Sequence, residues 1–342
     1  MDGPCGKNIE FSDDLANATL GGMVKAESLE PLGIGYMKTA DHLAVGGVDR
    51  GTDESQGMRF ETVPFRSFQR IKQALADREI YGALLPLPVA VDLLGKGVDI
   101  RLLVFVNREG GTLLYSRKAG NGVLKEFAGK SVLVPCLLSV EAMLLHRFFA
   151  RAGLQVGGHG AEGSAEDSDI RLVQVAPHLM PEIVKQDTDG DIAGFLMPEP
   201  YAERALEKGI GGFLLRTGSL WPRHPSSVLV FDCFVLRNHP EAAESFVKAM
   251  ETAGSRISRT SENDFADFTD AFFGRRLGPE NTVTQKRKEM FSPEMFLPEP
   301  DTIRMIMDYM STRMGMADFC GKIDELVQTG WCGEQENRGS KQ

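Results

Sequence analysis

GIGYMKTADH, residues 33–42, is a short apolar stretch that runs directly into a polar turn. Three later segments have the same arrangement: GALLPLP at 82–88, VLVPCLLS at 132–139 and AGFLMPEP at 193–200. Each segment is typical of a buried β-strand followed by a sharp turn. In an open α/β sheet, ligands bind outside the carboxyl ends of the strands. The four strand ends therefore predict a single binding cleft.

Between these segments, short apolar runs alternate with longer stretches of helical periodicity, which favours parallel βαβ units. The segment 67–78, for example, carries Phe68, Ile71, Ala74 and Leu75 on one face of an expected helix. We expect an α/β fold with mixed, mainly parallel sheets flanked by helices. The expected strands are 33–38, 58–64, 81–85, 100–106, 112–116, 131–134, 170–175, 192–197, 213–216 and 227–231. One helix is expected to start near residue 41. The other expected helices cover 67–78, 89–94, 140–152, 239–257 and 299–314.

The chain has 342 residues, which exceeds the usual size of one domain and favours two lobes. The turns NREGG at 107–111 and WPRHP at 221–225 read as the two crossings between the lobes. We therefore expect a discontinuous first lobe and a continuous second lobe, flanked by polar end segments. The expected bounds are 31–110 plus 223–330 for lobe 1, 111–222 for lobe 2, and 1–30 and 331–342 for the polar segments.

The composition excludes several classes of function. The chain carries 38 basic and 48 acidic residues, a net charge of −10, which opposes non-specific binding of nucleic acid. No apolar run approaches the roughly 20 residues that a membrane span requires. Residues 1–30 have neither the basic nor the apolar region of a signal peptide. The sequence thus predicts neither nucleic-acid binding nor a membrane-spanning helix.

The five cysteines are scattered and have neither CxxC nor zinc-site spacing. We expect free, mostly buried thiols, with a disulfide between Cys320 and Cys332 left open. The sequence also lacks a Gly-x-Ser-x-Gly elbow, a Walker loop and an HExxH motif. We therefore expect no catalytic residues, no metal and no cofactor.

The order and spacing of the four segments resemble the solute-binding proteins of ABC importers. The resemblance is to the nitrate/sulfonate/taurine/bicarbonate-binding group, which is related to the thiamine-pyrimidine synthases, and it covers about residues 31–260. It implies a two-lobed periplasmic-binding-protein fold of type II that closes around a small polar solute. It also implies an ABC permease with its ATPase as the partner, and an extracytoplasmic location. Because no signal peptide is evident, a cytoplasmic location is the alternative.

The resemblance further implies ligand contacts at the strand ends. The expected contacts are Thr39, Asp41, His42, Pro86, Pro88, Ser139, Glu141 and Glu199. Each has a structural alternative: a helix cap with a packed histidine, a rigid proline turn, or a carboxylate that stabilises the start of a helix. Glu199 lies between two prolines, where the family commonly has Gly-Glu-Pro, and this chain has Pro198 instead of that glycine.

The charges of these residues bear on the class of ligand. Asp41, Glu141 and Glu199 supply three carboxylates, and only His42 can become positive. Such a site suits an amine, an amino-pyrimidine or another ligand rich in hydrogen-bond donors. It does not suit nitrate, bicarbonate or a sulfonate unless a cation bridges the carboxylates. This hypothesis requires the three side chains to face the cleft.

Two other functions stay open. A ligand-sensing protein would use the same fold but relay occupancy to a regulator rather than to a permease. An enzyme resembling the thiamine-pyrimidine synthases is the second alternative, although those enzymes have a cysteine-rich motif that this sequence lacks.

Overall fold

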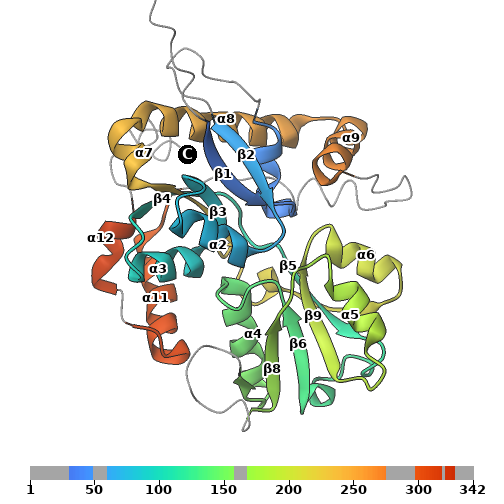
Figure 1. The fold of residues 1–342 in the computed structure, drawn as a ribbon. Helices are drawn as coiled ribbons and strands as arrows, with labels where there is room; N and C mark the ends of the chain where they lie inside the picture. The colour runs from blue at the N-terminus through green and yellow to red at the C-terminus, as the bar shows by residue number, and fades with distance from the viewer. Residues whose placement is uncertain (1–30, 49–59, 158–167, 275–296, 318–319, 328–342) are drawn as a thin grey trace, which may run out of the picture. The chain divides into compact units, whose positions relative to one another are not determined.

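The computed structural model describes residues 31–48, 60–157, 168–274, 297–317 and 320–327, all within one compact unit, Pro31–Gln342 (Figure 1). Both expected polar end segments and Cys332 lie outside these residues.

The first sheet has five strands in the order β2-β1-β3-β11-β4. Its strands are β1 (Leu32–Met37), β2 (Phe60–Phe65), β3 (Gly82–Pro86), β4 (Ile100–Phe105) and β11 (Ser227–Asp232). The pairs β1–β2 and β1–β3 are parallel, whereas β11 is antiparallel to both of its neighbours, β3 and β4. The sequence predicted each of these strands to within two residues at either end, but not the insertion of β11 between β3 and β4.

Helices cover both faces of the first sheet (Figure 1). They are α1 (Leu43–Gly46), α2 (Phe68–Ala76), α3 (Leu87–Gly95), α7 (Cys233–Asn238), α8 (Pro240–Arg259) and α9 (Glu262–Phe273). Leu85 of β3 belongs to the core that contains α2 and α3. Leu84, the preceding residue, belongs to the core that contains α1, α8 and α9. This alternation is what a strand buried on both faces requires.

The second sheet has six strands in the order β10-β5-β9-β6-β8-β7. They are β5 (Gly111–Ser116), β6 (Lys130–Val134), β7 (Val156–Gly157), β8 (Ile170–Gln174), β9 (Ile192–Pro198) and β10 (Gly211–Arg216). β5 is antiparallel to β9 and β10, and the other pairs are parallel. Its helices are α4 (Val140–Arg151), α5 (Met180–Gln186) and α6 (Tyr201–Glu207), with short 3-10 turns at η4 (Leu124–Phe127) and η6 (Thr217–Ser219).

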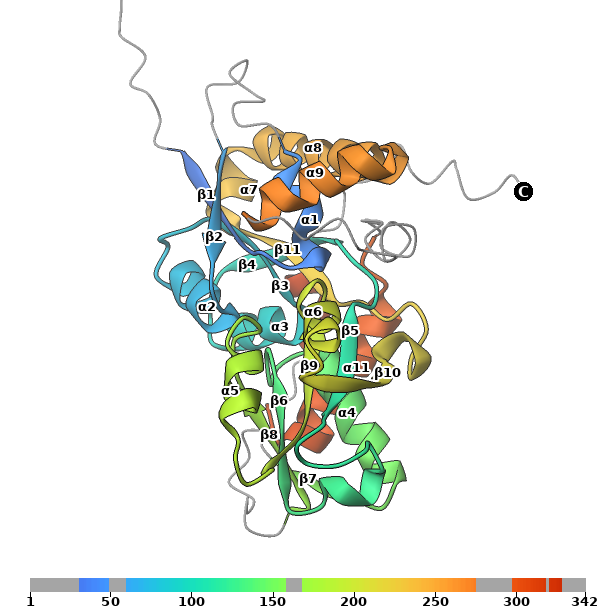
Figure 2. The same ribbon diagram turned by 90° about the vertical axis from the view of Figure 1, so that its right-hand side faces the viewer.

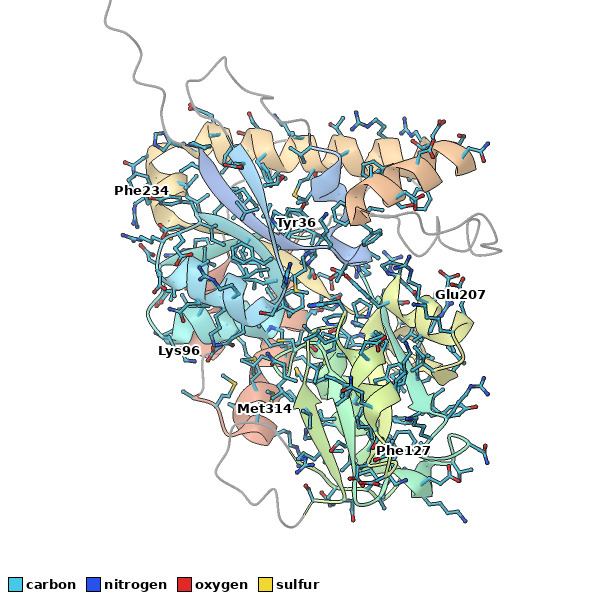
Figure 3. The ribbon with its side chains drawn as sticks, turned by 45° about the vertical axis from the view of Figure 1, so that its right-hand side comes forward. Tyr36, Lys96, Phe127, Glu207, Phe234 and Met314 are labelled. Carbon is cyan, nitrogen blue, oxygen red and sulfur yellow. The ribbon has the colours of Figure 1, made fainter. Side chains whose placement is uncertain are left out.

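Helix α11 (Pro300–Met314) packs against elements that belong to both sheets. The expected helix over 299–314 is present, and four of its apolar residues, Ile303, Ile306, Met307 and Met310, are buried. These side chains share one core with α2 and α3 beside the first sheet and with Val140, Met143 and Leu144 of α4 beside the second. Figure 2 shows α11 lying beside α4, and Figure 3 labels Met314 at its end. The chain continues into η7 (Cys320–Lys322) and α12 (Ile323–Leu326).

The assignment of strands to sheets supports the division into two lobes that we propose. All strands of the first sheet come from 32–105 and 227–232, and all strands of the second come from 111–216. None of the helices in the described segments combines the length and the apolar character that crossing a bilayer demands.

Two local expectations need correction. The chain after β1 forms a 3-10 turn, η2 (Ala40–His42), before the four-residue α1, rather than one helix beginning near Asp41. Thr39 precedes that turn, but its side chain makes no capping hydrogen bond. The helices α5, α6 and α7 were also missed. α5 and α6 have only seven residues each, which is too short to display helical periodicity clearly.

Candidate ligand-binding site

A cavity with about 450 Å³ of empty space, part of it open to solvent, is lined by residues from both sheets. All four segments that predicted the cleft contribute to its lining. They supply Thr39 and Asp41 after β1, Pro86 at the end of β3, Pro135, Cys136 and Ser139 after β6, and Leu196 and Pro198 of β9. The carboxyl ends of these strands therefore meet at one place, as they do in ligand sites of open α/β sheets.

Five of the eight expected contact residues line the cavity. They are Thr39, Asp41, Pro86, Ser139 and Glu141. His42, Pro88 and Glu199 are not part of the lining. The cavity therefore has two of the three carboxylates that the sequence placed there, one from the turn after β1 and one from the first turn of α4. Contact of any of these residues with a ligand remains a prediction.

Glu199 has a different place. Its Oε2 accepts a hydrogen bond from the backbone N–H of Glu203 at 3.1 Å, in the first turn of α6. This is the structural alternative considered for it, a carboxylate at the start of a helix. Its backbone oxygen accepts from the N–H of Ala40 at 3.0 Å. Nearby, the Tyr201 hydroxyl donates to the backbone oxygen of Lys38 at 3.2 Å. The turn after β9 is thus joined to the turn after β1 by two hydrogen bonds.

Pro88 is buried in the first turn of α3, where a proline satisfies the local backbone geometry. The rigid connection from β3 to α3 therefore places Pro86 against the cavity and Pro88 away from it.

Asp41 is held by a serine of the returning strand. Oδ2 of Asp41 accepts a 2.6 Å hydrogen bond from the hydroxyl of Ser227, the first residue of β11. The same oxygen lies 3.5 Å from Nε2 of His42. Ser227 also lines the cavity, and it pairs with Pro86, the last residue of β3.

His42 is fully buried behind Asp41, and its hydrogen bonds fix its tautomer. Nδ1 accepts from the backbone N–H of Met37 at 2.9 Å, so the ring hydrogen is on Nε2. Nε2 lies 3.1 Å from the hydroxyl oxygen of Ser227 and donates to it. Burial lowers the pKa of His42, and the charge of Asp41 opposes that shift only in part. The ring is therefore neutral near pH 7.

This serine, histidine and aspartate are not a nucleophilic triad. In such a triad the histidine accepts the hydroxyl hydrogen at one nitrogen, while its other nitrogen donates to the carboxylate. Here Nδ1 is occupied by a backbone N–H and Nε2 carries a hydrogen, so the ring cannot accept the hydrogen of Ser227. The serine hydrogen goes directly to Asp41. The arrangement orients a carboxylate and does not activate a nucleophile.

Glu141 has an equivalent partner. Its Oε1 accepts a 2.6 Å hydrogen bond from the hydroxyl of Ser226. Glu141 lies in the first turn of α4, where the positive end of the helix favours a carboxylate. That helix starts as predicted, with Ser139 as its N-cap accepting from the N–H of Ala142 at 3.1 Å.

Among the described residues of the cavity wall, two buried polar atoms have no hydrogen-bond partner. They are the hydroxyl Oγ1 of Thr39, which can donate or accept, and the carboxylate Oδ1 of Asp41, which can only accept. Thr39 is 1% exposed, and the Asp41 side chain is 10% exposed. A buried polar atom without a partner costs about 1–3 kcal/mol, a cost that a hydrogen-bond donor on a ligand would remove at Asp41 and that a donor or an acceptor would remove at Thr39.

The cavity wall has no positive side chain among the described residues: no lysine, arginine or histidine belongs to its lining. The rest of the wall is mainly apolar, with Phe68, Leu196 and the prolines. Throughout the described residues, no group of three or more histidine, cysteine, aspartate or glutamate residues could hold a metal ion. The described lining thus combines two carboxylates with a mainly apolar wall.

Cys136 is a free thiol in the cavity wall, as the sequence predicted for the cysteines in general. Burial raises its pKa to about 12, and the charge of Glu141 adds to the shift. Its Sγ donates to the backbone oxygen of Leu138 at 3.4 Å. The group is therefore a protonated, weakly reactive thiol near neutral pH.

The sequence did not identify several residues of the wall. Phe68 was assigned only to the apolar face of a helix, Ser227 was read as the start of a returning strand, and Ser226 was given no role. Their place in the cavity depends on the pairing of β11 with β3 and β4. The only local hint is two consecutive serines after the WPRHP turn.

The comparison with known sequences gives one family and one curated relative. The model of the NMT1-like family matches residues 25–267. The nitrate import ATP-binding protein NrtC of Synechocystis sp. is 25% identical over 197 residues, covering 54% of this chain and 28% of that protein. This chain thus spans less than a third of the length of that relative.

Solved structures share the fold at low sequence identity. The alkanesulfonate-binding protein SsuA of Xanthomonas axonopodis pv. citri, bound to MOPS, has a TM-score of 0.69 and 14% identity, covering 84% of this chain and 95% of its own. The periplasmic nitrate-binding protein NrtA of Synechocystis PCC 6803 has a TM-score of 0.68 and 16% identity, covering 87% and 86%. A Candida albicans protein with the generic periplasmic-binding-protein fold has a TM-score of 0.61 and 14% identity, covering 88% and 92%. The expected periplasmic-binding-protein fold is confirmed.

Proposed function

Because the chain belongs to the NMT1-like family, we propose that it is a solute-binding protein that captures a small polar ligand for an ABC-type importer. The relatives named for nitrate import, nitrate binding and alkanesulfonate binding support this general role. We propose an ABC permease with its ATPase as the partner and an extracytoplasmic location, with a cytoplasmic location as the alternative.

The ligand that we propose is an amine, an amino-pyrimidine or a similar donor-rich molecule. The observation that carries this proposal is the pair of carboxylates, Asp41 and Glu141, in a cavity whose described lining has no cation. Each carboxylate receives one serine hydroxyl, and Oδ1 of Asp41 has no partner. Nitrate and sulfonates present only acceptor oxygens, so these carboxylates would repel them. The ligand class proposed here thus differs from those of the named relatives.

The mechanism that we propose is hinge closure. The lobes are connected by two segments, 106–110 and 217–226, which we call the hinge. Its segments are joined by hydrogen bonds from the N–H of Glu109 to the oxygen of His224 at 2.8 Å and from the N–H of Ser226 to the oxygen of Asn107 at 3.1 Å. A ligand that contacts carboxylates from both lobes would stabilise the closed state and shift the equilibrium toward it.

The test is a thermal-shift and calorimetric titration of the purified chain with nitrate, methanesulfonate, taurine, methylamine and 4-aminopyrimidine. A ligand that binds only the folded state raises the unfolding midpoint, and the stabilisation grows with the logarithm of the ratio of ligand concentration to dissociation constant. We expect a shift with the donor-rich compounds that is lost in Asp41→Asn and Glu141→Gln, and retained in Glu61→Gln, which changes an exposed carboxylate of β2. Glu199→Ala shows separately whether that residue contributes to ligand affinity. Binding of nitrate or methanesulfonate unaffected by Asp41→Asn and Glu141→Gln would disprove the ligand class.

A sensing role is the second candidate, since it would use the same closure. It predicts that the closed protein binds a regulator rather than a permease, and affinity capture with and without ligand distinguishes the two. The third candidate is an enzyme resembling the thiamine-pyrimidine synthases. It predicts turnover of a bound pyrimidine precursor, which product analysis would detect.

A further inference from the structure

We propose that Ser226 and Ser227 are positioning residues that make the cavity select hydrogen-bond donors over oxyanions. This inference rests on the proposed function, since it explains how the cavity discriminates between ligands. The two serines are adjacent in the chain, yet each holds a different carboxylate: Ser226 holds Glu141 and Ser227 holds Asp41.

The hydroxyl of Ser227 has its hydrogen committed to Asp41. His42 donates from Nε2 to the serine oxygen, because its Nδ1 accepts from the backbone of Met37. The serine hydrogen is then directed to Oδ2 of Asp41 at 2.6 Å. The chain of donors therefore runs in one direction, from Met37 through His42 and Ser227 to Asp41. It leaves Oδ1 of Asp41, a residue of the cavity wall, as a buried acceptor without a hydrogen-bond partner.

The hydroxyl of Ser226 is committed in the same way. Its single hydrogen goes to Oε1 of Glu141 at 2.6 Å. A serine in a binding site can usually donate to an anion, because its hydroxyl rotates freely. Here both serines line the cavity but have already given their hydrogens to carboxylates. The two hydroxyls thus increase the acceptor character of the wall instead of offering donors to an oxyanion.

Backbone hydrogen bonds fix Ser226, the last residue of the hinge, and Ser227, the first residue of β11. The N–H of Ser226 donates to the oxygen of Asn107 at 3.1 Å, and the oxygen of Ser227 accepts from the N–H of Val106 at 2.9 Å. The two residues are therefore paired with the outgoing segment of the chain, while their side chains reach one carboxylate from each lobe. Rigid support of this kind holds an acceptor in place without a loss of entropy when the ligand binds.

The test uses acetamidinium and acetate, two planar ions of the same shape with opposite charge and opposite hydrogen-bonding character. Their dissociation constants are measured by NMR titration of backbone amides in the full chain. We expect the wild type to prefer acetamidinium. Ser226→Ala and Ser227→Ala should each weaken acetamidinium binding about tenfold or more, as expected for a hydrogen bond to a charged group. Ser226→Thr and Ser227→Thr keep the hydroxyl, so these variants should bind acetamidinium as the wild type does. Ser258→Ala, on the exposed surface, should leave the affinity for acetamidinium unchanged.

A second readout requires no ligand. Long-range ¹H–¹⁵N spectra of the wild type should show the hydrogen of His42 on Nε2, and the same spectra verify that each variant is folded. A hydrogen on Nδ1 would reverse the donor chain and overturn the inference. Alanine variants that bind acetamidinium as tightly as the wild type would overturn the role of the serines and leave the proposed ligand class standing. A wild type that prefers acetate would overturn both.

Discussion

Ser226 donates a 2.6 Å hydrogen bond to Glu141, and this bond links the hinge to the first turn of α4. Glu141 is 8% exposed, so its carboxylate depends on protein donors rather than on bulk water. The corresponding bond from Ser227 holds Asp41 in the turn after β1. Neither sheet alone forms the cavity, because its lining comes from the strand ends of both sheets and from the two serines at the start of β11.

Loss of the Ser226 hydroxyl should destabilise the folded protein. Ser226→Ala leaves a buried carboxylate oxygen without its donor, at a cost of about 1–3 kcal/mol in the free energy of unfolding. Urea unfolding followed by circular dichroism measures this change. Ser258→Ala removes an exposed hydroxyl and should stay within about 0.5 kcal/mol of the wild type. Equal unfolding midpoints for the two variants would show that water replaces the serine without loss.

Cys136 should react slowly with alkylating reagents. Because burial raises its pKa to about 12, its thiolate fraction at pH 8 is roughly a thousandfold or more below that of a thiol with an ordinary pKa of about 8.5. Glu141→Gln removes a charge that contributes to the shift, so it should lower the pKa and accelerate alkylation. Mass spectrometry of the peptide containing Cys136, during exposure to iodoacetamide, measures the rate.

Cys233 is the internal control for that experiment. Its pKa is also raised to about 12, by burial and by a hydrogen bond with Asp99. Glu141 is not among the causes of that shift, so Glu141→Gln should leave the alkylation rate of Cys233 unchanged. An equal acceleration at both cysteines would mean that the variant loosens the whole fold rather than changing the charge beside Cys136.

His42 should make stability depend on pH. Its folded-state pKa is lowered because burial disfavours the imidazolium. Below the unfolded-state pKa of about 6.5, the unfolded chain therefore binds more protons, and the stability contributed by the neutral ring is lost as the pH falls toward the folded-state pKa. This residue should lower the free energy of unfolding by up to about 1.4 kcal/mol per pH unit in that window.

Urea unfolding at pH 7.5, 6.5 and 5.5 measures this slope. His42→Asn keeps an acceptor for the N–H of Met37 but removes the titrating ring, so it should be less stable at pH 7.5 and have a shallower dependence on pH. If the variant and the wild type lost stability equally between pH 6.5 and 5.5, the dependence would come from other groups.

The sequence indicated the cavity through local signals. The turns after β1, β3, β6 and β9 follow short apolar strands, and parallel strands bring their carboxyl ends to one edge of a sheet. Each of these turns or strand ends contributes at least one residue to the lining. These four strands and the chemistry of their ends were therefore predictable from segments of ten residues or fewer.

The orientation of individual side chains was not predictable in this way. Glu199 lies between two prolines in the expected turn, but its carboxylate accepts from the first turn of α6. Ser226 and Ser227 enter the site only because β11 pairs with β3 and β4, which precede it by more than a hundred residues in the chain. Local periodicity does not reveal which distant strands pair, because that pairing depends on how the whole chain packs.

Helix α11 provides a test of how the core spans both sheets. Met310 is fully buried in the core that contains residues of α3 and α4, whereas Met305 on the same helix is 46% exposed. Met310→Ala removes a large side chain from a packed site and should cost about 2–5 kcal/mol in the free energy of unfolding. Met305→Ala has the same chemistry at an exposed site and should change stability by less than about 0.5 kcal/mol. Chemical denaturation of both variants gives the comparison, and similar losses in the two would contradict the packing of α11 between α3 and α4.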